Sequence, residues 1–514
     1  MMRTARLLAP LFAGALSLPV AAQALELEAA GGSMPGPLTL DAHPGLYPFE
    51  LVVIIPSTTA GPTPLQLIDP LDFRSLDVGL DLLSLMWLVL TDFDGHGVVQ
   101  VPLGSNPALV DAPLYFQAVT LQWLPNLVDR ISNGNVVRLG LAGSFRDRAV
   151  EFFDDRAFAT ALVRPDRKVM LVGGARGQLL AQVAWSSTEL YDAATDTFSY
   201  GPSLNAARSL HTMTQLQDGR WLVAGGVNFT NDPQATCEIY DPVADTFTPV
   251  ASMGTPRMGH TATLLADGRV LVTGGIQAMP ITPTQLEPIH QTVATSEYYD
   301  PIADSWSAGP NLSKPRAGHI ALERPDGKIL FCGGISWDPN IIFGWVPAVR
   351  SSCDLYDPTG GTMSAGPAMN TARALADPVE LAPGRWLVAG GMNGLSIIPY
   401  NPGNPTAAAE IYDAATNSWT SVGSMATARA NHKGWAIGNG RFLLAGGGAN
   451  SILSPTPLSS TEIFDTATNT FSPGPQLNSE RAGATAIRTP QGQMMLLGGA
   501  SATAITRTTE WYYF

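Results

Sequence analysis

Seven arginines recur with fixed partners, and they could form either an anion-binding ring or a set of buried ion pairs. Each Arg stands 17 residues before a Gly-Gly pair, and an acidic residue follows each pair, with an aromatic residue two positions later. A guanidinium and a carboxylate can satisfy each other's charge and hydrogen bonds when both are buried. Because the two residue types appear in every copy, we expect ion pairs that belong to the scaffold.

The repeated residues can be read directly from the sequence. The arginines are Arg156, Arg208, Arg257, Arg316, Arg373, Arg429 and Arg481. The acidic residues are Glu189, Glu238, Glu297, Asp354, Glu410, Glu462 and Glu510.

Four histidines stand three residues after an Arg and could suggest a metal site: His211, His260, His319 and His432. The other three copies have Ala at this position. Repeated units would hold these His residues too far apart to share an ion at the roughly 2.0–2.1 Å of a zinc–nitrogen bond. We therefore expect the His residues to pack between units, and we predict no metal, cofactor or catalytic residues.

The elements that position these residues are short strands. The stretch Arg257–Gly275 contains two apolar runs joined by an Asp-Gly-Arg turn, which predicts two β-strands. The acidic residue and its aromatic neighbour mark a third strand, and a large apolar residue nine positions after the acid marks a fourth in six copies. Four antiparallel strands in a unit of about 50 residues are typical of a propeller blade.

The spacing therefore predicts an all-β, seven-bladed propeller over residues 141–514. The last acidic residue, Glu510, leaves no room for a fourth strand before Phe514, so we expect a strand from about 141–148 to close the ring. Closure would remove the exposed sheet edges of an open array. A six-bladed ring with one additional unit is the alternative.

These spaced features resemble the kelch-repeat β-propellers of the galactose-oxidase-like type. Some relatives of that type are copper radical oxidases, which need a Tyr crosslinked to Cys, a second Tyr and paired His ligands. This sequence has no His-His pair, and its cysteines Cys237, Cys332 and Cys353 lie beside the repeated motifs. Periplasmic sugar isomerases of the kelch type offer no residue-level match either. The resemblance implies the fold and carries over no active-site residue.

Residues 25–140 alternate strand-like runs with Gly, Pro, Asn and Asp, and they predict a small β-sandwich of five to seven strands. The sequences of residues 101–121 and 132–139 resemble a short module of large secreted bacterial proteins. The run Asp92–His96 has alternating carboxylates that could hold calcium, but it lacks the later ligands of a calcium loop. We expect an Asp-Gly turn there.

Residues 1–24 predict a secretory signal peptide. Arg3 and Arg6 precede the apolar run 7–20, and Ala22-Gln23-Ala24 fits a cleavage site. The run is short for the alternative, a membrane anchor. We therefore expect a secreted or periplasmic monomer that has no membrane span after signal removal.

The composition excludes some classes of function. A net charge of −14 argues against a nucleic-acid partner, and 45% hydrophobic residues argue against disorder.

Cys332 and Cys353 could form a disulfide if their strands are neighbours, or they could be two small buried side chains.

The segments between Gly pair and acid vary, and three are long: 276–296, 335–353 and 392–409. Long loops on a rigid scaffold are frequent binding sites, and aromatic residues with Arg often anchor ligands. The candidate contact residues are Trp337, Phe343, Trp345, Arg350, Tyr400 and His290. The alternative is that these aromatic side chains only pack the loops against the scaffold and contact no ligand.

We therefore predict a binding or interaction module for an unknown protein or glycan. The alternative function is an extracellular carbohydrate-active enzyme or a galactose-oxidase-like oxidase.

Overall fold

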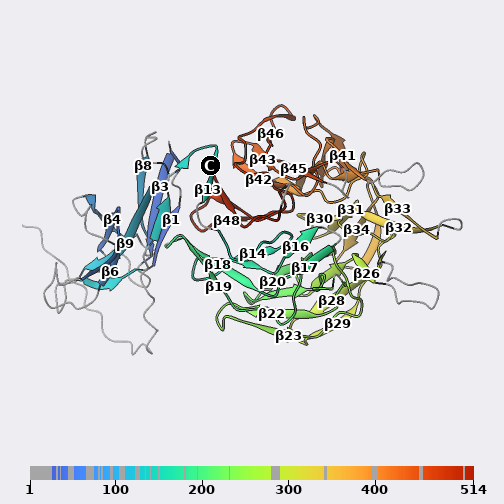
Figure 1. The fold of residues 1–514 in the computed structure, drawn as a ribbon, viewed down its shortest axis with the longest axis horizontal. Helices are drawn as coiled ribbons and strands as arrows, with labels where there is room; N and C mark the ends of the chain where they lie inside the picture. The colour runs from blue at the N-terminus through green and yellow to red at the C-terminus, as the bar shows by residue number, and fades with distance from the viewer. Residues whose placement is uncertain are drawn as a thin grey trace, which may run out of the picture. The chain divides into compact units, whose positions relative to one another are not determined.

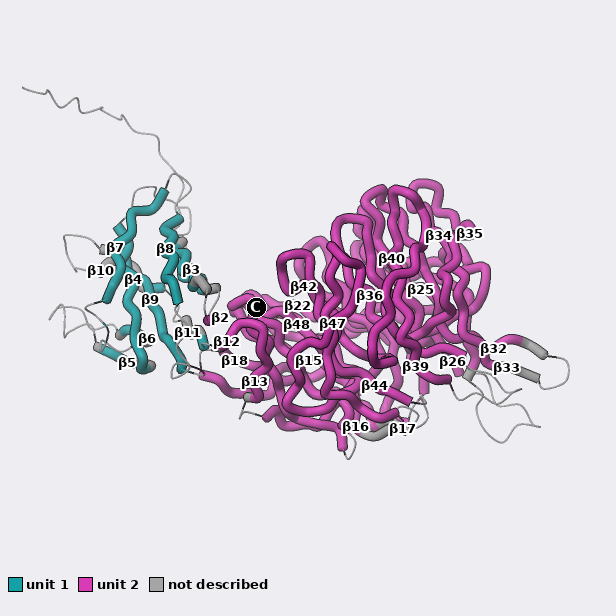
Figure 2. The backbone as a smooth tube through the Cα atoms, turned by 90° about the horizontal axis from the view of Figure 1, so that it is seen from above, with its two compact units in different colours: residues 1–30, 37–103, 111–139 teal, residues 31–36, 104–110, 140–514 magenta. Residues whose placement is uncertain are grey.

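The computed structural model divides the chain into two compact units. Residues 1–30, 37–103 and 111–139 form unit 1, and residues 31–36, 104–110 and 140–514 form unit 2 (Figure 2). The residues described are 26–30, 33–34, 36–43, 51–64, 75–78, 82, 85–92, 96–103, 110, 112–121, 128–132, 135–138, 140–148, 151–178, 181–193, 195–230, 232–278, 290–340, 344–394, 403–450, 455–501 and 504–514. Within these ranges no helix has the length and hydropathy that a membrane span requires.

Unit 1 contains two sheets that enclose an apolar core. One sheet has the order β1 (Glu26–Ala30), β3 (Gly36–His43), β8 (Gly97–Leu103), and the other has the order β10 (Val128–Ile131), β9 (Pro113–Leu121), β4 (Leu51–Ser57), β7 (Trp87–Leu90), with β11 (Asn135–Arg138) also on β9. Strands β5 (Ala60–Pro64) and β6 (Ser75–Val78) form a separate pair. Alternate residues point inward, so Leu38 and Leu40 of β3 meet Val52 and Ile54 of β4 in the core.

The predicted turn at Asp92–His96 joins β7 to β8. The N–H of Asp92 donates to the carbonyl of His96 at 2.9 Å, and the N–H of His96 donates to Oδ1 of Asp92 at 2.9 Å. Residues 93–95 lie outside the described ranges.

In unit 2 the described residues form seven four-stranded antiparallel sheets, which we number in chain order (Figure 1). The first three are β14 (Thr160–Val163), β15 (Val169–Val172), β18 (Thr188–Asp192), β19 (Thr197–Tyr200); β20 (Thr212–Gln215), β21 (Trp221–Ala224), β22 (Cys237–Asp241), β23 (Thr246–Val250); and β24 (Thr261–Leu264), β25 (Val270–Thr273), β28 (Ser296–Asp300), β29 (Ser305–Ala308). The fourth and fifth are β30 (Ile320–Glu323), β31 (Ile329–Cys332), β34 (Cys353–Asp357), β35 (Thr362–Gly366); and β36 (Pro378–Ala382), β37 (Arg385–Ala389), β40 (Ala409–Asp413), β41 (Ser418–Ser421).

The sixth sheet is β42 (Lys433–Gly438), β43 (Arg441–Ala445), β46 (Thr461–Asp465), β47 (Thr470–Pro473), and the seventh is β48 (Thr485–Arg488), β49 (Met494–Leu497), β50 (Thr509–Tyr513), β13 (Ser144–Arg148). A short parallel pair, β2 (Ser33–Met34) and β12 (Gly140–Leu141), precedes β13. The all-β fold class predicted from the sequence is confirmed.

The seventh sheet combines strands from distant parts of the chain. Strand β13 pairs antiparallel with β50, with Ser144 opposite Tyr513 and Arg148 opposite Thr509. In Figure 1 the red strand β48 of this sheet lies next to β14 of the first sheet, and the two strands are in contact. Each of the seven sheets therefore has four strands.

A circuit of backbone hydrogen bonds joins the seven sheets. The residue two positions after each repeated Arg has a left-handed backbone, with φ between 53° and 64°. Its N–H donates to the carbonyl of the equivalent residue in the preceding sheet, at 2.8 to 3.4 Å. The residues are Phe158, Leu210, Gly259, Gly318, Leu375, Asn431 and Gly483. The bond from Phe158 to Gly483 closes the circuit, so the ring of first strands is continuous.

A second circuit runs through the Gly pairs. The N–H of each second Gly donates to the carbonyl of the repeated Arg of the next sheet, and Gly499 closes this circuit on Arg156. A side chain would not fit here: a Cβ on Gly274 would lie 2.5 Å from the carbonyl of Arg316, and its φ is +66°. The Gly pairs are therefore required where neighbouring sheets approach each other.

Candidate functional site

The two ends of the sheets differ. At one end, which we call the hairpin end, lie the Gly pairs and the connections between second and third strands. At the other end, the turn end, tight turns join first to second and third to fourth strands. Two-stranded hairpins extend five connections at the hairpin end: β16 (Ala175–Gln178) with β17 (Ala181–Ala184), β26 (Ile276–Ala278) with β27 (His290–Thr292), β32 (Ile335–Asn340) with β33 (Gly344–Val349), β38 (Met392–Asn393) with β39 (Asn404–Pro405), and β44 (Gly448–Ala449) with β45 (Thr456–Pro457).

A disulfide anchors the base of the β32–β33 hairpin. Cys332 and Cys353 are directly opposite each other in β31 and β34, and their sulfurs are bonded. Both side chains are buried, and the 21-residue separation encloses the whole hairpin. Of the two interpretations left open by the sequence, the structure has the disulfide.

Two of the predicted contact residues stabilise this hairpin. The backbone N–H of Trp337 donates to Oγ1 of Thr292 at 2.8 Å, which connects the hairpins of the third and fourth sheets. The guanidinium of Arg350 forms an ion pair with Asp338, so its charge is compensated within the hairpin. Trp337 and Arg350 are both half-buried.

The other four predicted contact residues have no described side chain. His290 begins β27 opposite Ala278, and Trp345 lies in β33 opposite Pro339, but only their backbones are described. Phe343 and Tyr400 lie outside the described ranges. The structure therefore brings Trp337 and Arg350 together on one hairpin and leaves the remaining four residues as predictions.

The seven repeated Arg residues all have the same buried partners. Arg257 is fully buried, and its Nη1 donates to the carbonyls of Gly274 and Thr295 at 2.7 and 3.0 Å. Its Nη2 donates to Glu297 at 2.6 Å. The ion pairs of the seven sheets measure 2.6 to 3.1 Å. Burial lowers the pKa of Arg257, and the Glu297 carboxylate opposes that shift.

The acidic partners also hold the backbone that enters each sheet. Glu297 accepts the N–H groups of Gly254 and Thr255 at 2.6 and 3.0 Å. Each carboxylate therefore joins the Arg to the loop arriving from the preceding sheet. With their Nη donors used inside the sheet, these Arg residues have a geometry suited to a scaffold rather than to an anion site.

The His series bridges neighbouring sheets. His211, His260 and His319 bond through Nε2 to a Thr hydroxyl of the preceding sheet, at 2.8 to 3.0 Å. Burial lowers the pKa of His211 and His260 to about 3, so their imidazoles are neutral. No group of three or more His, Cys, Asp or Glu suited to a metal ion occurs among the described residues.

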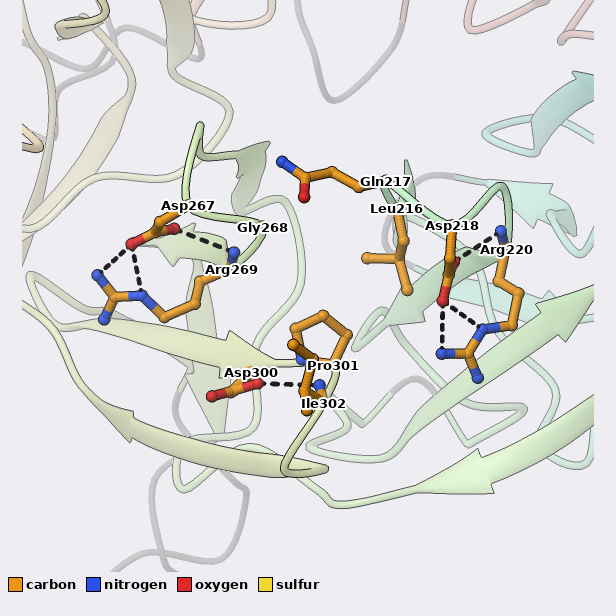
Figure 3. Close-up of a pocket in the computed structure, with 10 residues that line it drawn as sticks. All are labelled: Leu216, Gln217, Asp218, Arg220, Asp267, Gly268, Arg269, Asp300, Pro301 and Ile302. Carbon is orange, nitrogen blue, oxygen red and sulfur yellow. Dashed lines mark hydrogen bonds and ion pairs between the residues drawn. The ribbon is translucent and has the colours of Figure 1, made fainter.

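A pocket of about 540 Å³ lies at the turn end, between the second and third sheets (Figure 3). Its walls come from the β20–β21 turn with Asp218 and Arg220, the β24–β25 turn with Asp267 and Arg269, and the β28–β29 turn. A hydrogen bond from Arg220 lowers the pKa of Asp218. The repeated Asp-Gly-Arg turns were visible in the sequence, but their proximity across two sheets was not.

Comparisons with known proteins found a family model and solved structures that are similar to this chain. The kelch motif matches residues 218–254. A solved structure described as a novel fungal alcohol oxidase with catalytic diversity among the AA5 family, in complex with copper, is similar with a TM-score of 0.55 and 18% identity, covering 72% of this chain and 76% of its own. The solved structure of YjhT has a TM-score of 0.44 and 16% identity, covering 59% of this chain and 93% of its own. No curated protein sequence matches the chain.

The kelch match and the fold of the fungal oxidase confirm the resemblance drawn from the Arg, Gly-Gly and acid spacing. The chain has the fold of a kelch-repeat β-propeller of the galactose-oxidase-like type. At 18% identity the likeness extends to the fold alone.

Proposed function

We propose that the protein is a secreted or periplasmic binding module that takes a protein or glycan ligand at the hairpin end. The observation that carries this proposal is the anchoring of the β32–β33 hairpin. A disulfide closes its base, an Arg350–Asp338 ion pair lies along it, and Trp337 is bonded to the hairpin of the third sheet. A pre-ordered hairpin binds with a smaller loss of conformational entropy than a flexible loop would.

The location outside the cytoplasm is supported by two features. Residues 1–24 have the pattern of a signal peptide, and disulfides persist in oxidising compartments. Fractionation of the producing cells, with alkylation of Cys332 and Cys353 before and after reduction, tests this part. Recovery of the protein in the cytoplasm with both thiols alkylated without reduction would contradict it.

The binding experiment compares the full chain with its Trp337→Ala variant on a glycan array and against proteins from the same extracellular fraction. Loss of a buried aromatic anchor typically weakens binding by about 30-fold or more. Asp465→Asn, at the turn end of the sixth sheet, is the control and should bind like the unaltered protein. Equal binding by Trp337→Ala would contradict the proposed surface. Stoichiometric copper with peroxide production would instead favour the oxidase alternative.

A further inference from the structure

The turn-end pocket has a negative charge that its own arginines do not neutralise. Asp300 ends β28 in the pocket wall, and its Oδ1 accepts the N–H groups of Ile302 and Ala303 at 2.9 and 3.1 Å (Figure 3). No ion pair to Asp300 occurs among the residues that the structure describes. We propose that this pocket, with the apolar turn tips beside it, is a second interaction surface, for a protein segment that has a Lys or Arg next to an apolar residue.

Equivalent Asp residues have a cationic partner in the first, fourth and fifth sheets, whereas Asp241 of the second sheet, like Asp300, has no ion pair among the described residues. In the first sheet, Lys168 pairs with Asp192 at 3.0 Å, and in the fourth sheet Lys328 pairs with Asp357 at 2.8 Å. Both Asp residues occupy the position of Asp300 at the end of the third strand. The third sheet has Arg269 at the position of these lysines, so a cation is present in the sequence but does not reach the carboxylate.

The reason lies in the turn between the first and second strands. In the first and fourth sheets Arg164 and Arg324 pair with the Asp of that turn, whereas the second and third sheets have a Leu in their place, so there the Arg two residues after the turn Asp pairs with it instead. The guanidinium of Arg269 is held by Asp267 of its own turn at 2.7 Å and lies 4.3 Å from the centre of the Tyr298 ring. Tyr298 is half of a buried tyrosine pair, with its hydroxyl 2.8 Å from that of Tyr356. The first, second, fourth, fifth and sixth sheets have an aliphatic residue at this position: Leu190, Ile239, Leu355, Ile411 and Ile463. The ion pair with Asp267 thus holds Arg269 away from Asp300, and the cation–π contact with Tyr298 adds a second contact in that position.

Two almost fully exposed aliphatic side chains lie at equivalent turns of the second and third sheets. Ile302, in the pocket wall, is 97% exposed, and Val243, at the same position of the second sheet, is 92% exposed. The fourth, fifth and sixth sheets have Thr359, Ala415 and Ala467 at that position. Ile302, in the pocket wall, supplies the apolar part of the proposed surface, and Val243 offers the same chemistry on the second sheet.

The chemistry of the partner follows from these groups. A cationic side chain would complete the ion pair that Asp300 lacks, and an apolar neighbour would cover Ile302 and the floor residue Leu216. The apolar tips extend over two sheets and so favour a protein partner over a small free amine. This surface is at the opposite end of the sheets from the hairpins, so it is independent of the proposed hairpin function.

The test is an array of short peptides in which a central Lys or Arg has Leu, Ile or Phe on either side between Gly-Ser spacers. The same peptides with Gln replacing the basic residue form the comparison set. Full-length protein should prefer the basic set. Asp300→Asn should weaken that binding about two- to fivefold, as expected for a partly exposed ion pair. Ile302→Ser should weaken it about tenfold through lost apolar contact.

The matched control is Asp465→Asn in the sixth sheet. Asp465 occupies the same repeat position, accepts the N–H of Ala467 at 2.8 Å and lines no described pocket. It should bind the array like the unaltered protein. Equal binding of the Lys and Gln sets, or binding that Asp300→Asn leaves unchanged, would overturn the proposal. A free lysine amide that competes as well as the peptides would show a small-amine site instead.

Discussion

Two Arg–Asp pairs, one in the fourth sheet and one in the hairpin that extends it, illustrate the difference between scaffold and contact surface. Arg316 and Asp354 are 0% and 1% exposed and 2.7 Å apart, and the same pairing recurs in all seven sheets. Arg350 and Asp338 are 21% and 30% exposed and belong to the β32–β33 hairpin. The first pair joins strands and an entering loop, whereas the second joins the two sides of one connection. An Arg–Asp ion pair should therefore contribute more to stability where both side chains are buried than where both are partly exposed to water.

The largest effect is expected from breaking the buried pair. Arg316→Met should lower the free energy of unfolding by about 3 to 5 kcal/mol, because the Asp354 carboxylate would remain buried without its cation. Denaturant titration of the full chain measures this. If Arg316→Met unfolded at the same denaturant concentration as the unaltered protein, the scaffold role of the repeated pairs would be wrong.

Removing the disulfide should have the next largest effect. The double substitution Cys332→Ala and Cys353→Ala should cost about 2 to 4 kcal/mol, because the unfolded chain loses a crosslink around a loop with a 21-residue separation. Thermal unfolding with and without a reductant measures it, and the reductant should not affect the double variant. Cys237→Ala is the control for loss of a buried sulfur, and its unfolding should still respond to the reductant.

The buried His bridges should make the scaffold sensitive to acid. Burial lowers the pKa of His260 from 6.5 to about 3, so below pH 6.5 the unfolded chain takes up a proton that the folded protein does not. Stability should therefore be complete above pH 6.5 and fall by about 1.4 kcal/mol per pH unit for each such His. His260→Gln should reduce the slope of unfolding free energy against pH between 6 and 4. An unchanged slope would show that His260 is already protonated in the fold.

The smallest effect is expected from the exposed pair. Arg350→Met should change the free energy of unfolding by about 1 kcal/mol or less, because both partners keep contact with water. It is also the matched control for Arg316→Met, since both variants remove an Arg from the fourth sheet. A cost equal to that of Arg316→Met would remove the distinction between the two pairs.

Much of the scaffold was predictable because each of its interactions needs particular residue types. The Arg, the acidic residue and the Gly pair recur at fixed spacing since a buried ion pair and a close backbone approach tolerate few substitutions. The hydrogen-bond circuit was not predictable, because its left-handed positions are occupied by Phe158, Asn431, leucines and glycines alike. Backbone geometry repeats there while the side chains do not.

The candidate contact surfaces were harder to predict, because they depend on contacts between sheets. The aromatic hairpin could be proposed from its composition, and the structure adds the bond from Trp337 to Thr292. The turn-end pocket depends on Asp267 and Tyr298 both contacting Arg269, so that Arg269 forms no ion pair with Asp300, and the sequence spacing did not show these contacts.

The pairing of β13 with β50 has a consequence for how the protein is made. Residues 144–148 leave the ribosome long before residues 509–513, which complete their sheet. At typical synthesis rates of about 5 to 20 residues per second, the delay is roughly 20 to 70 seconds. During that interval β13 lacks its partner strand, and an unpaired strand edge can pair with other chains. The strand that completes the seventh sheet is thus an unpaired edge of the nascent chain until residues 509–513 have been made.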